Sequence, residues 1–478
     1  MRPDPEPVPN GWNRRPDGAE DSHSDSAWTT VARLRRRRAR DIWLREPARA
    51  RAMLLDREAD VGLDGPSLGL FAWLELTVEG DEKAAETAAR AALARSPAEP
   101  FATAALAEVL TRRGENDEAV EVLARARRAH PAVGWYDLTL ADALVEAGRV
   151  ADAEAILERS ADDGRLRRHA LKRLSRLALE RGDEERARGF FAALVDLAPN
   201  YLVYASDYVT LGSLQLRAGE ADAARETWRQ GTEVYPRHRG LRRLLAEHFG
   251  ENGSPAAPRI PPLAESALGV RRIPVRTEMI TTRRRLAEVL DEATAGVRQA
   301  GDVIALAESA AAAGQGRMLP LELVDPGLLA SSLSRFVGEL GPLHSPEGMQ
   351  GAIMESGRLR VVSGAVAGGV GKVLGRKGWF YRVAGPAAAM IDDVAGCLPP
   401  HDHHVIFGPA EPDALATALA RDLGCEVAIV DANHRSGAWV VGSSDGVDRT
   451  WLSGVLGDNP AGNEDEQTPV VIVRRLTA

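Results

Sequence analysis

Cysteine, lysine and long apolar runs are all scarce in this sequence of 478 residues. Two cysteines, Cys397 and Cys425, are too few for a disulfide scaffold or a cysteine-built zinc site, and they suit a reducing cytoplasm. No run of 18 apolar residues is present, and residues 1–9 are acidic and proline-rich, where a signal peptide is basic and then apolar. We therefore expect a soluble cytoplasmic protein with no membrane partner.

The charge balance argues against a nucleic-acid partner, since the net charge is −9 at pH 7. Six arginines nevertheless fall between residues 33 and 40, just before Trp43. They form either an arm that touches nucleic acid or an acidic membrane surface, or a solvated first helical turn. The absence of interleaved aromatic residues favours the helical turn. We predict disorder over residues 1–27, which are rich in Pro, Asp, Ser and Gly, and a basic helical lead-in over 28–60.

Glycine recurs with a fixed period in the first half of the chain. Four glycines lie 34 residues apart, and prolines keep the same register: Gly80, Gly114, Gly148, Gly182, Pro97, Pro131 and Pro199. Small residues after each glycine let paired helices approach, the glycine turns between them, and the proline ends the second helix. The pattern returns at Gly219 after a 37-residue step. Residues 61–250 are therefore predicted to form an all-α solenoid of tetratricopeptide-type repeats.

A stack of such repeats presents a groove that holds a peptide, a protein helix or the chain's own tail. We expect a protein or peptide partner there, with four candidate groove residues: Tyr201, Tyr204, Arg165 and Arg168. The competing interpretation places the tyrosines in the helical core, where aromatic residues of such repeats more often lie.

The helical period stops near Gly250, and a Pro-rich stretch predicts a linker over residues 251–268. Beyond it, short β-branched apolar runs alternate with helical stretches, which indicates an α/β or α+β domain over residues 269–478. Strands are expected over residues 303–307, 359–362, 404–407, 427–430, 439–441 and 470–473, and helices over 283–294, 328–340 and 413–423.

A glycine-rich run over residues 364–378 follows one of the expected strands. Its backbone N–H groups and cationic side chains could cradle a phosphate. It is not a Walker loop, since Val373 replaces the Ser or Thr that holds magnesium. Only four of the 60 basic residues are lysine, yet two of them, Lys372 and Lys377, fall in this run. We predict phosphate or substrate binding there, and a flexible surface loop is the alternative.

Carboxylates and histidines supply two further candidate sites. Asp431 ends a buried strand, and Asp392 with Asp393 closes a helix, so these carboxylates are candidates to share one Mg²⁺ or Mn²⁺ that bridges to nucleotide phosphates. In the alternative, which the residues alone favour, Asp431 caps the following turn and the Asp392–Asp393 pair is solvated. The last cluster precedes a strand and is either a zinc site or, as we favour, a surface turn, because its histidines suit a tetrahedral site poorly: His401, Asp402, His403 and His404.

Four blocks of the second domain carry a family resemblance: GDVIALAESAAAAGQGR (301–317), GRKGWFYRVAGPAAAMID (375–392), EPDALATALARDLGCEVAIVDAN (411–433) and DNPAGNEDEQTPVVIVR (458–474). Together they resemble the bacterial branch of the coenzyme F-420 γ-glutamyl ligase family. The resemblance implies a homodimeric amide ligase that uses GTP, or ATP, and a divalent metal. It implies an acceptor carboxylate that is phosphorylated and then attacked by the amine of glutamate. It places the metal at Asp392 and Asp431 and the nucleotide at Met279, Ile280 and Thr281. The family's nucleotide lysine is absent here, and Lys372 and Lys377 are the candidates to replace its charge.

Three alanines depart from the family pattern. Ala313, Ala395 and Ala432 stand where the family has a lysine, an asparagine and a threonine. A deazaflavin acceptor is therefore not carried over. The predicted function is an amide ligase, most simply a γ-glutamyl ligase, acting on a small-molecule or protein carboxylate that the repeats recruit. The alternative is a non-catalytic adaptor, or a sensor of a nucleotide or metabolite, that keeps only the ligase fold.

Overall fold

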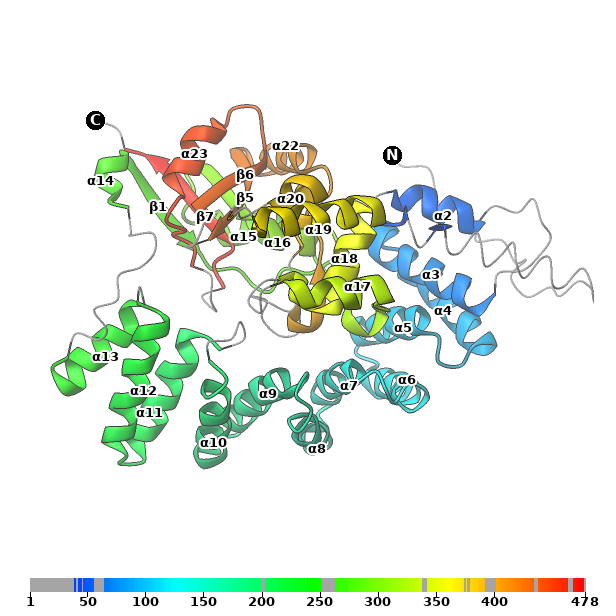
Figure 1. Cartoon of the computed structure of the whole chain (residues 1–478), viewed down its shortest axis with the longest axis horizontal. Helices are drawn as coiled ribbons and strands as arrows, with labels where there is room; N and C mark the ends of the chain where they lie inside the picture. The colour runs from blue at the N-terminus through cyan, green and yellow to red at the C-terminus, as the bar shows by residue number, and fades with distance from the viewer. Residues whose placement is uncertain are drawn as a thin grey trace, which may run out of the picture. The chain divides into compact units, whose positions relative to one another are not determined.

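The computed structural model describes residues 38–39, 42–44, 46–55, 64–198, 203–236, 238–251, 263–337, 342–373, 375, 379–391, 401–433, 437–462 and 467–476. The chain divides into two compact units, Met1–Ala153 and Glu154–Ala478 (Figure 1). Of the arginine run, the described residues include only Arg38, which is exposed, while Trp43 is 3% exposed. Across the described ranges, no helix combines the length and apolar character needed to cross a membrane.

Helices of the first half come in pairs, which confirms the predicted helical repeats. Within the described ranges the pairs are α3 (Gly65–Leu74), continued by η1 (Glu75–Glu79), with α4 (Glu82–Arg95); α5 (Pro100–Arg112) with α6 (Asn116–Ala129); α7 (Trp135–Glu146) with α8 (Val150–Ser160); α9 (Arg167–Glu180) with α10 (Glu184–Val195); and α11 (Ala205–Arg217) with α12 (Ala221–Val234). Helix α2 (Pro47–Leu55) precedes them, and α13 (Arg239–Phe249) follows.

The turn inside each pair requires glycine for its backbone angle. Gly80, Gly114, Gly148, Gly182 and Gly219 have φ between 72° and 82°, the left-handed region that other residues avoid. A Cβ added at any of them would meet nothing within 4 Å, so space is not the constraint. Five residues after each glycine lies an alanine with 0% exposure, which lets the second helix pack closely on the first: Ala85, Ala119, Ala153, Ala187 and Ala224.

The second domain is built on a five-stranded sheet with the order β1-β7-β2-β5-β6. The strands are β1 (Val270–Val275), β2 (Val303–Ala307), β5 (Glu426–Asn433), β6 (Gly437–Ser443) and β7 (Val470–Arg475). Strands β2 and β5 are parallel, and the other neighbours are antiparallel. A separate ribbon pairs β3 (Met318–Pro320) with β4 (His404–Ile406). The strands expected from the sequence are thus confirmed, except at residues 359–362.

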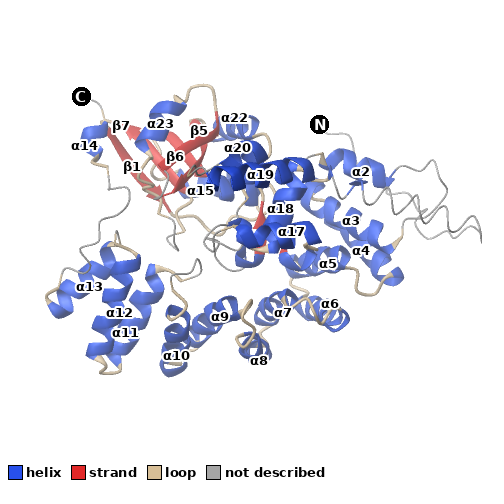
Figure 2. Ribbon diagram, viewed as in Figure 1, coloured by secondary structure: helices blue, strands red, loops and turns tan. Residues whose placement is uncertain are grey.

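Helices cover both faces of this sheet (Figure 2). Because side chains alternate along a strand, Ile304 and Leu306 of β2 face one hydrophobic core and Val303 and Ala305 face another. The first core includes α15 (Leu286–Thr294), α16 (Glu308–Gly314) and α22 (Pro412–Leu423); the second includes α23 (Arg449–Val455). The remaining elements are α14 (Glu265–Leu268), η2 (Leu321–Leu323), α17 (Leu328–Leu333), η3 (Ser334–Phe336), η4 (Pro342–His344), α18 (Pro346–Ser356), α19 (Arg358–Val373), α20 (Trp379–Ala384), α21 (Pro386–Ala389) and η5 (His401–His403).

The glycine-rich run is helical, so the predicted strand at residues 359–362 and the predicted phosphate loop that follows it are both wrong as far as Val373. All of these residues belong to α19. A Cβ on Gly364 would lie 2.9 Å from the Cβ of Ala384 and 3.0 Å from the carbonyl oxygen of Phe380, both in α20. The glycine therefore allows two helices to pack closely. Lys372 lies on α19 with an undescribed side chain, and Lys377 lies outside the described residues.

Gly364→Ala is expected to lower the free energy of unfolding by about 1–3 kcal/mol, because the added methyl group overpacks the contact with α20. Gly369→Ala is the matched control on the same helix, since a Cβ there would meet nothing within 4 Å. It should be neutral or stabilising by up to about 1 kcal/mol. Thermal unfolding of the full chain compares the two variants, and equal melting temperatures would contradict close packing at Gly364.

Candidate functional site

The carboxyl ends of three strands lie along one edge of the five-stranded sheet. Strand β7 is antiparallel to both β1 and β2, and β2 is parallel to β5, so β1, β2 and β5 run in the same direction. Residues that follow these three strands therefore share an edge with the residues that precede β7. In α/β sheets, ligands commonly bind at the carboxyl ends of the strands.

Two described carboxylates follow neighbouring strands at this edge. Asp431 lies near the end of β5, and Glu308 follows β2 as the first residue of α16. The register pairs Ala307 with Val430, so Glu308 and Asp431 are the residues that come next along the chain after this pair. Glu308 is 8% exposed, and Asp431 is half-buried. The sequence analysis missed Glu308, although its position directly after an apolar strand was a usable signal.

A cross-strand hydrogen bond holds the Asp431 carboxylate. The Nε1–H group of Trp439, its partner residue on β6, donates a 2.9 Å hydrogen bond to it. Burial raises the pKa of Asp431, and hydrogen bonds from Trp439 and Asn433 offset this only in part. Because β5 continues to Asn433, the alternative in which Asp431 caps a turn is wrong. Asp392 lies outside the described residues, so the predicted Asp392–Asp431 pair stays a prediction.

The predicted nucleotide segment leaves β1 at this same edge. Ile280 is 5% exposed and belongs to the hydrophobic core, whereas Met279 and Thr281 are half-exposed. Any contact by Ile280 with a nucleotide therefore involves its backbone. The hydroxyl oxygen of Thr281 accepts a 3.2 Å hydrogen bond from the backbone N–H of Arg283, which orders the turn into α15.

A strained residue fixes this segment to the sheet. Gln467, just before β7, has φ of 56°, an uncommon value for a residue other than glycine. Its carbonyl accepts a 3.2 Å hydrogen bond from the N–H of Thr277, and its side-chain oxygen lies 3.4 Å from Arg276. Backbone strain of this kind collects at binding sites, and the sequence offered no sign of it.

A second cluster, the Asp402 cluster, joins α9 of the repeats to η5 of the α/β domain. Asp402 has 0% exposure and accepts hydrogen bonds of 2.7 and 2.8 Å from the Arg173 guanidinium. The Nδ1 atom of His169 lies 3.0 Å from its Oδ2, and the Nδ1 atom of His403 lies 3.5 Å from its Oδ1. Nδ1 of His403 lies 3.3 Å from the same guanidinium. The predicted surface turn is therefore wrong, because partners more than 200 positions away in the sequence bury these residues.

Burial and charge shift the pKa values of this cluster in different directions. Burial lowers the pKa of His169 to about 4 and lowers that of His404 well below its usual value. For Asp402, burial opposes ionisation, but Arg173 and two histidines outweigh it and hold the pKa well below the usual range. Burial also opposes the charge on His403, whose pKa is nevertheless raised by Asp402 and Glu322. Asp402 is thus a buried carboxylate anion.

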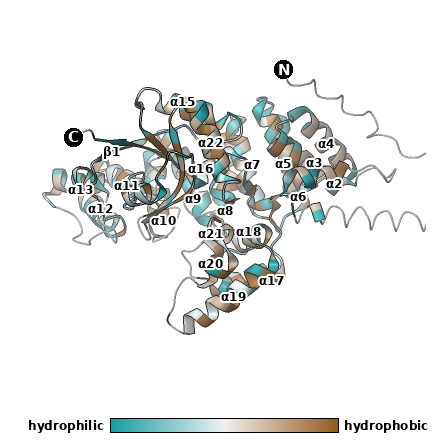
Figure 3. Ribbon diagram, turned by 90° about the horizontal axis from the view of Figure 1, so that it is seen from above, coloured by the Kyte–Doolittle hydropathy of each residue, from teal (hydrophilic) through white to brown (hydrophobic). Residues whose placement is uncertain are grey.

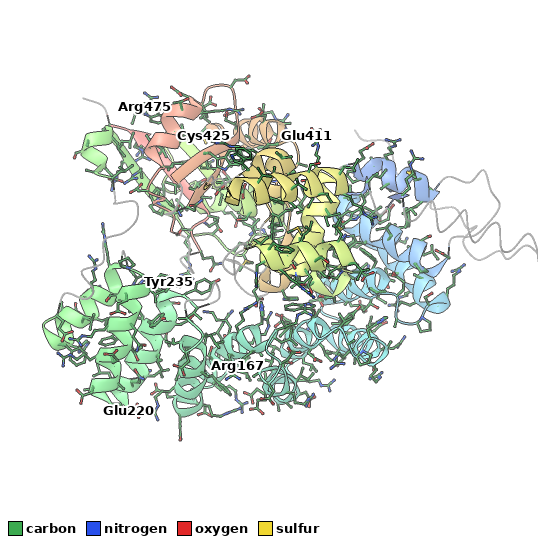
Figure 4. All side chains as sticks on the ribbon, viewed as in Figure 1. Arg167, Glu220, Tyr235, Glu411, Cys425 and Arg475 are labelled. Carbon is green, nitrogen blue, oxygen red and sulfur yellow. The ribbon has the colours of Figure 1, made fainter. Side chains whose placement is uncertain are left out.

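The structure places the four predicted groove residues in different environments. Tyr204 is 2% exposed, with the Lys172 ammonium 4.4 Å from its ring centre, so it belongs to the repeat core. Arg165 forms an ion pair with Glu347 of α18. Arg168 is half-exposed beside His169, and Tyr201 lies outside the described residues. Figure 4 labels Arg167, which marks the start of α9.

The Asp402 cluster explains where the chain divides. The division falls at Ala153, inside α8, and not in the predicted linker over residues 251–268. Buried hydrogen bonds between α9 and η5 make the last repeats and the α/β domain one compact unit. The sequence carried a signal that the prediction did not use, since His169, Lys172 and Arg173 lie on one face of α9.

Described side chains do not complete a metal site. Among the described residues, no group of three or more His, Cys, Asp or Glu side chains is placed to hold a metal ion. The zinc interpretation of the histidine cluster therefore finds no support there. Glu308 and Asp431 remain as two hard oxygen donors at the sheet edge, of the type that Mg²⁺ and Mn²⁺ prefer.

Comparison with known proteins identifies the repeats. The sequence model of the tetratricopeptide repeat family matches residues 79–133, 138–201 and 209–257, so the first half of the chain carries tetratricopeptide repeats. No curated protein matches the chain.

Several solved structures are similar to part of the chain. YrrB, described as a TPR protein with an unusual peptide-binding site, shares 20% identity with a TM-score of 0.31, covering 38% of this chain and 92% of its own. Pseudomonas aeruginosa PilF shares 17% identity with a TM-score of 0.34, covering 47% and 99%. BtubC from P. vanneervenii shares 18% identity with a TM-score of 0.29, covering 50% and 97%.

Proposed function

We propose that the tetratricopeptide repeats bind a protein or peptide and that the α/β domain is an amide ligase. In this proposal the ligase uses GTP or ATP with Mg²⁺ or Mn²⁺ and forms a γ-glutamyl bond on a carboxylate that the repeats recruit. The acceptor is a small molecule or a protein. The observation that carries the enzymatic half is the sheet edge, along which the segment after β1, the carboxylate after β2 and the carboxylate on β5 all lie.

The order of the strands supports this reading of the α/β domain. Three of the four blocks that resemble the γ-glutamyl ligase family contribute β2, β5 and β7, which are neighbours in one sheet. The segment expected to contact the nucleotide leaves β1, the strand beside β7. Exposed Arg276 and Arg283 on this segment supply positive charge for nucleotide phosphates.

The donor set at the edge fits a hard divalent cation in part. Asp431 would hold Mg²⁺ or Mn²⁺, and Glu308, directly after the neighbouring strand β2, is a second carboxylate among the described residues of this edge. When bound, such an ion neutralises charge on the phosphoryl group that is transferred. The backbone hydrogen bond between Thr277 and Gln467 would help to orient the nucleotide segment, and the hydrogen bond from Trp439 would orient the Asp431 carboxylate.

The proposed reaction has two balanced steps. An oxygen of the acceptor carboxylate attacks the γ-phosphorus of the nucleotide, and the nucleoside diphosphate leaves. The amine of glutamate then attacks the acyl carbon, the carbon–oxygen bond to phosphate breaks, and the nitrogen loses a proton to give the amide. A recruited protein or peptide would bring its acceptor carboxylate to the sheet edge for the first step.

The proposal that the repeats bind a partner is supported by the contacts that the α9 region already makes. Arg165, in the turn before α9, pairs with Glu347, and Arg173 of α9 pairs with Asp402, so this part of the repeats binds carboxylates from distant segments. Neighbouring repeats offer the same helical scaffold to a separate polypeptide, and arrays of this kind commonly act as docking surfaces. The repeats would thereby determine which acceptor reaches the ligase domain.

Asp431→Asn is expected to reduce metal-dependent GTP turnover by the full chain about 100-fold or more, since it removes a charged metal ligand while keeping the side-chain shape. The matched control is Asp445→Asn, an exposed carboxylate of the same domain. Release of phosphate from GTP in the presence of Mn²⁺ measures the effect. Equal loss in both variants, or full turnover by Asp431→Asn, would contradict the proposed site.

A non-catalytic adaptor or nucleotide sensor is the second candidate. It is favoured by Ala313 and Ala432, which replace family residues, and by the existing hydrogen bond between Trp439 and Asp431. Calorimetry separates the candidates. Binding of GTP or ATP without turnover supports the sensor, whereas binding of neither nucleotide nor metal leaves the repeats as an adaptor.

A further inference from the structure

Helix α19 exposes an apolar stripe that the proposed ligase reaction does not use. Leu359 is 86% exposed, Val362 39%, Val366 65% and Val370 47%. At 100° per residue these four side chains fall within about an 80° arc of the helix, over a length of about 16 Å. Apart from its first residues, α19 is coloured white to brown in Figure 3, which shows how little of it is hydrophilic.

The opposite face of α19 is also apolar. Val361 has 0% exposure, and Gly364 packs against α20. Residues 361–371 contain no charged side chain. A helix that is apolar on all sides is normally buried on all sides, whereas the described residues of the chain cover only the inner face of α19.

The charges around the apolar stripe of α19 indicate what kind of surface would bind it. Arg358 and Arg360 are both exposed and flank the apolar stripe on either side at its start. Residues 358–391 contain six basic residues and no aspartate or glutamate, although the whole chain has a net charge of −9. The surface that covers this stripe is therefore expected to be anionic.

A second copy of the chain does not match this pattern. Two α19 helices packed along their stripes, in either direction, would bring basic ends together without a carboxylate to pair with them. The stripe also offers a protein partner few polar groups, since Ser363 is its only exposed hydroxyl between Arg360 and Val370. A lipid surface needs no such groups, and it accepts an apolar face flanked by arginines.

We propose that α19 lies on an anionic lipid surface, with Leu359, Val362, Val366 and Val370 in the boundary between headgroups and acyl chains. Arg358 and Arg360 then contact the lipid phosphates. The helix lies in the plane of the surface and does not cross it, because its 16 residues are too few to span a bilayer. This association is independent of the ligase reaction.

Co-sedimentation of the full chain with lipid vesicles tests the proposal. We expect the chain to sediment with vesicles that contain phosphatidylglycerol and to stay in solution with vesicles of phosphatidylcholine alone. Val366→Asp should weaken binding about tenfold, as one buried valine is lost. Arg358→Gln with Arg360→Gln should weaken it about thirtyfold, since each basic residue near an anionic surface contributes about fivefold.

Matched controls keep the test specific to α19. Val297→Asp changes another partly exposed valine, and Arg243→Gln with Arg421→Gln removes two exposed arginines elsewhere. These variants should bind as the unmodified chain does, and unchanged melting temperatures show that each variant is folded. Failure to sediment with anionic vesicles overturns the proposal. Equal binding by Val366→Asp overturns it too, as does a dimer in light scattering that this substitution disrupts.

Discussion

Arg173→Ala is expected to lower the free energy of unfolding of the unit formed by residues 154–478 by about 3–5 kcal/mol. Asp402 has 0% exposure, and Arg173 donates both short hydrogen bonds to its carboxylate. Removal of the guanidinium leaves a buried negative charge with only histidine contacts. Differential scanning calorimetry of the full chain should show a lower transition for this unit, separated from the transition of the first repeats.

A matched variant and a double variant make this result specific. Arg176→Ala removes an exposed arginine from the same helix and should change stability by less than about 0.5 kcal/mol. The combination of Arg173→Ala with Asp402→Ala should cost less than the sum of the two single changes, because it removes both buried charges. Additive losses would contradict a direct Arg173–Asp402 interaction, and an equal loss in Arg176→Ala would point to a general effect on α9.

Acidification from pH 7 to pH 5 is expected to destabilise the same unit. The pKa of His169 is lowered to about 4 in the folded state, so the unfolded chain takes up a proton first as the pH falls through 6.5. The stability from neutral His169 is complete above pH 6.5 and is lost progressively toward pH 4. At about 1.4 kcal/mol per pH unit, His169 alone costs about 2 kcal/mol between pH 6.5 and pH 5.

Other groups of the Asp402 cluster change how steeply the folding stability falls with pH. Burial lowers the pKa of His404 well below its usual value, so His404 adds to the loss of stability in acid. The pKa of His403 is raised, so its contribution is present below its ordinary pKa and opposes the loss. Asp402 does not change the stability between pH 7 and pH 5, because its carboxylate stays ionised throughout this range in both the folded and the unfolded chain. Arg168 and Arg173 stay charged throughout.

Melting temperatures at pH 7, 6 and 5 measure this effect. His169→Gln keeps an N–H donor for Asp402 but cannot titrate, so its melting temperature should fall less with acidification. His248→Gln replaces an exposed histidine and should keep the full slope. If His169→Gln responds to pH as strongly as the unmodified chain does, the buried neutral His169 is not the origin of the instability.

The sequence alone determined the repeat half, because the relevant constraints are local. A left-handed turn at Gly114 and a fully buried Ala119 five residues later are properties of one helix pair, repeated along the chain. Period and residue size are sufficient to predict such pairs. The strands of the α/β domain were also predicted from short β-branched runs, since most of them are buried on both faces.

Errors arose where contacts distant in the sequence override local preference. Residues 359–362 look like a strand by composition, but Gly357, with φ of 85°, ends α18 and allows α19 to begin directly after it. The sequence alone suggests that Gly364 is a loop residue, whereas in the structure it allows α20 to pack closely on α19. Neither fact is visible in a short window of sequence.

Only the tertiary structure decided which polar residues form sites. Asp402 and Arg173 are 229 positions apart, and their burial depends on the α/β domain packing against α9, which no local pattern encodes. Glu308 and Asp431 likewise become neighbours only because β2 and β5 pair in parallel register. The sequence by itself determined the helical repeats and the strand content, whereas packing of distant segments decided the charges of the Asp402 cluster and the make-up of the sheet edge.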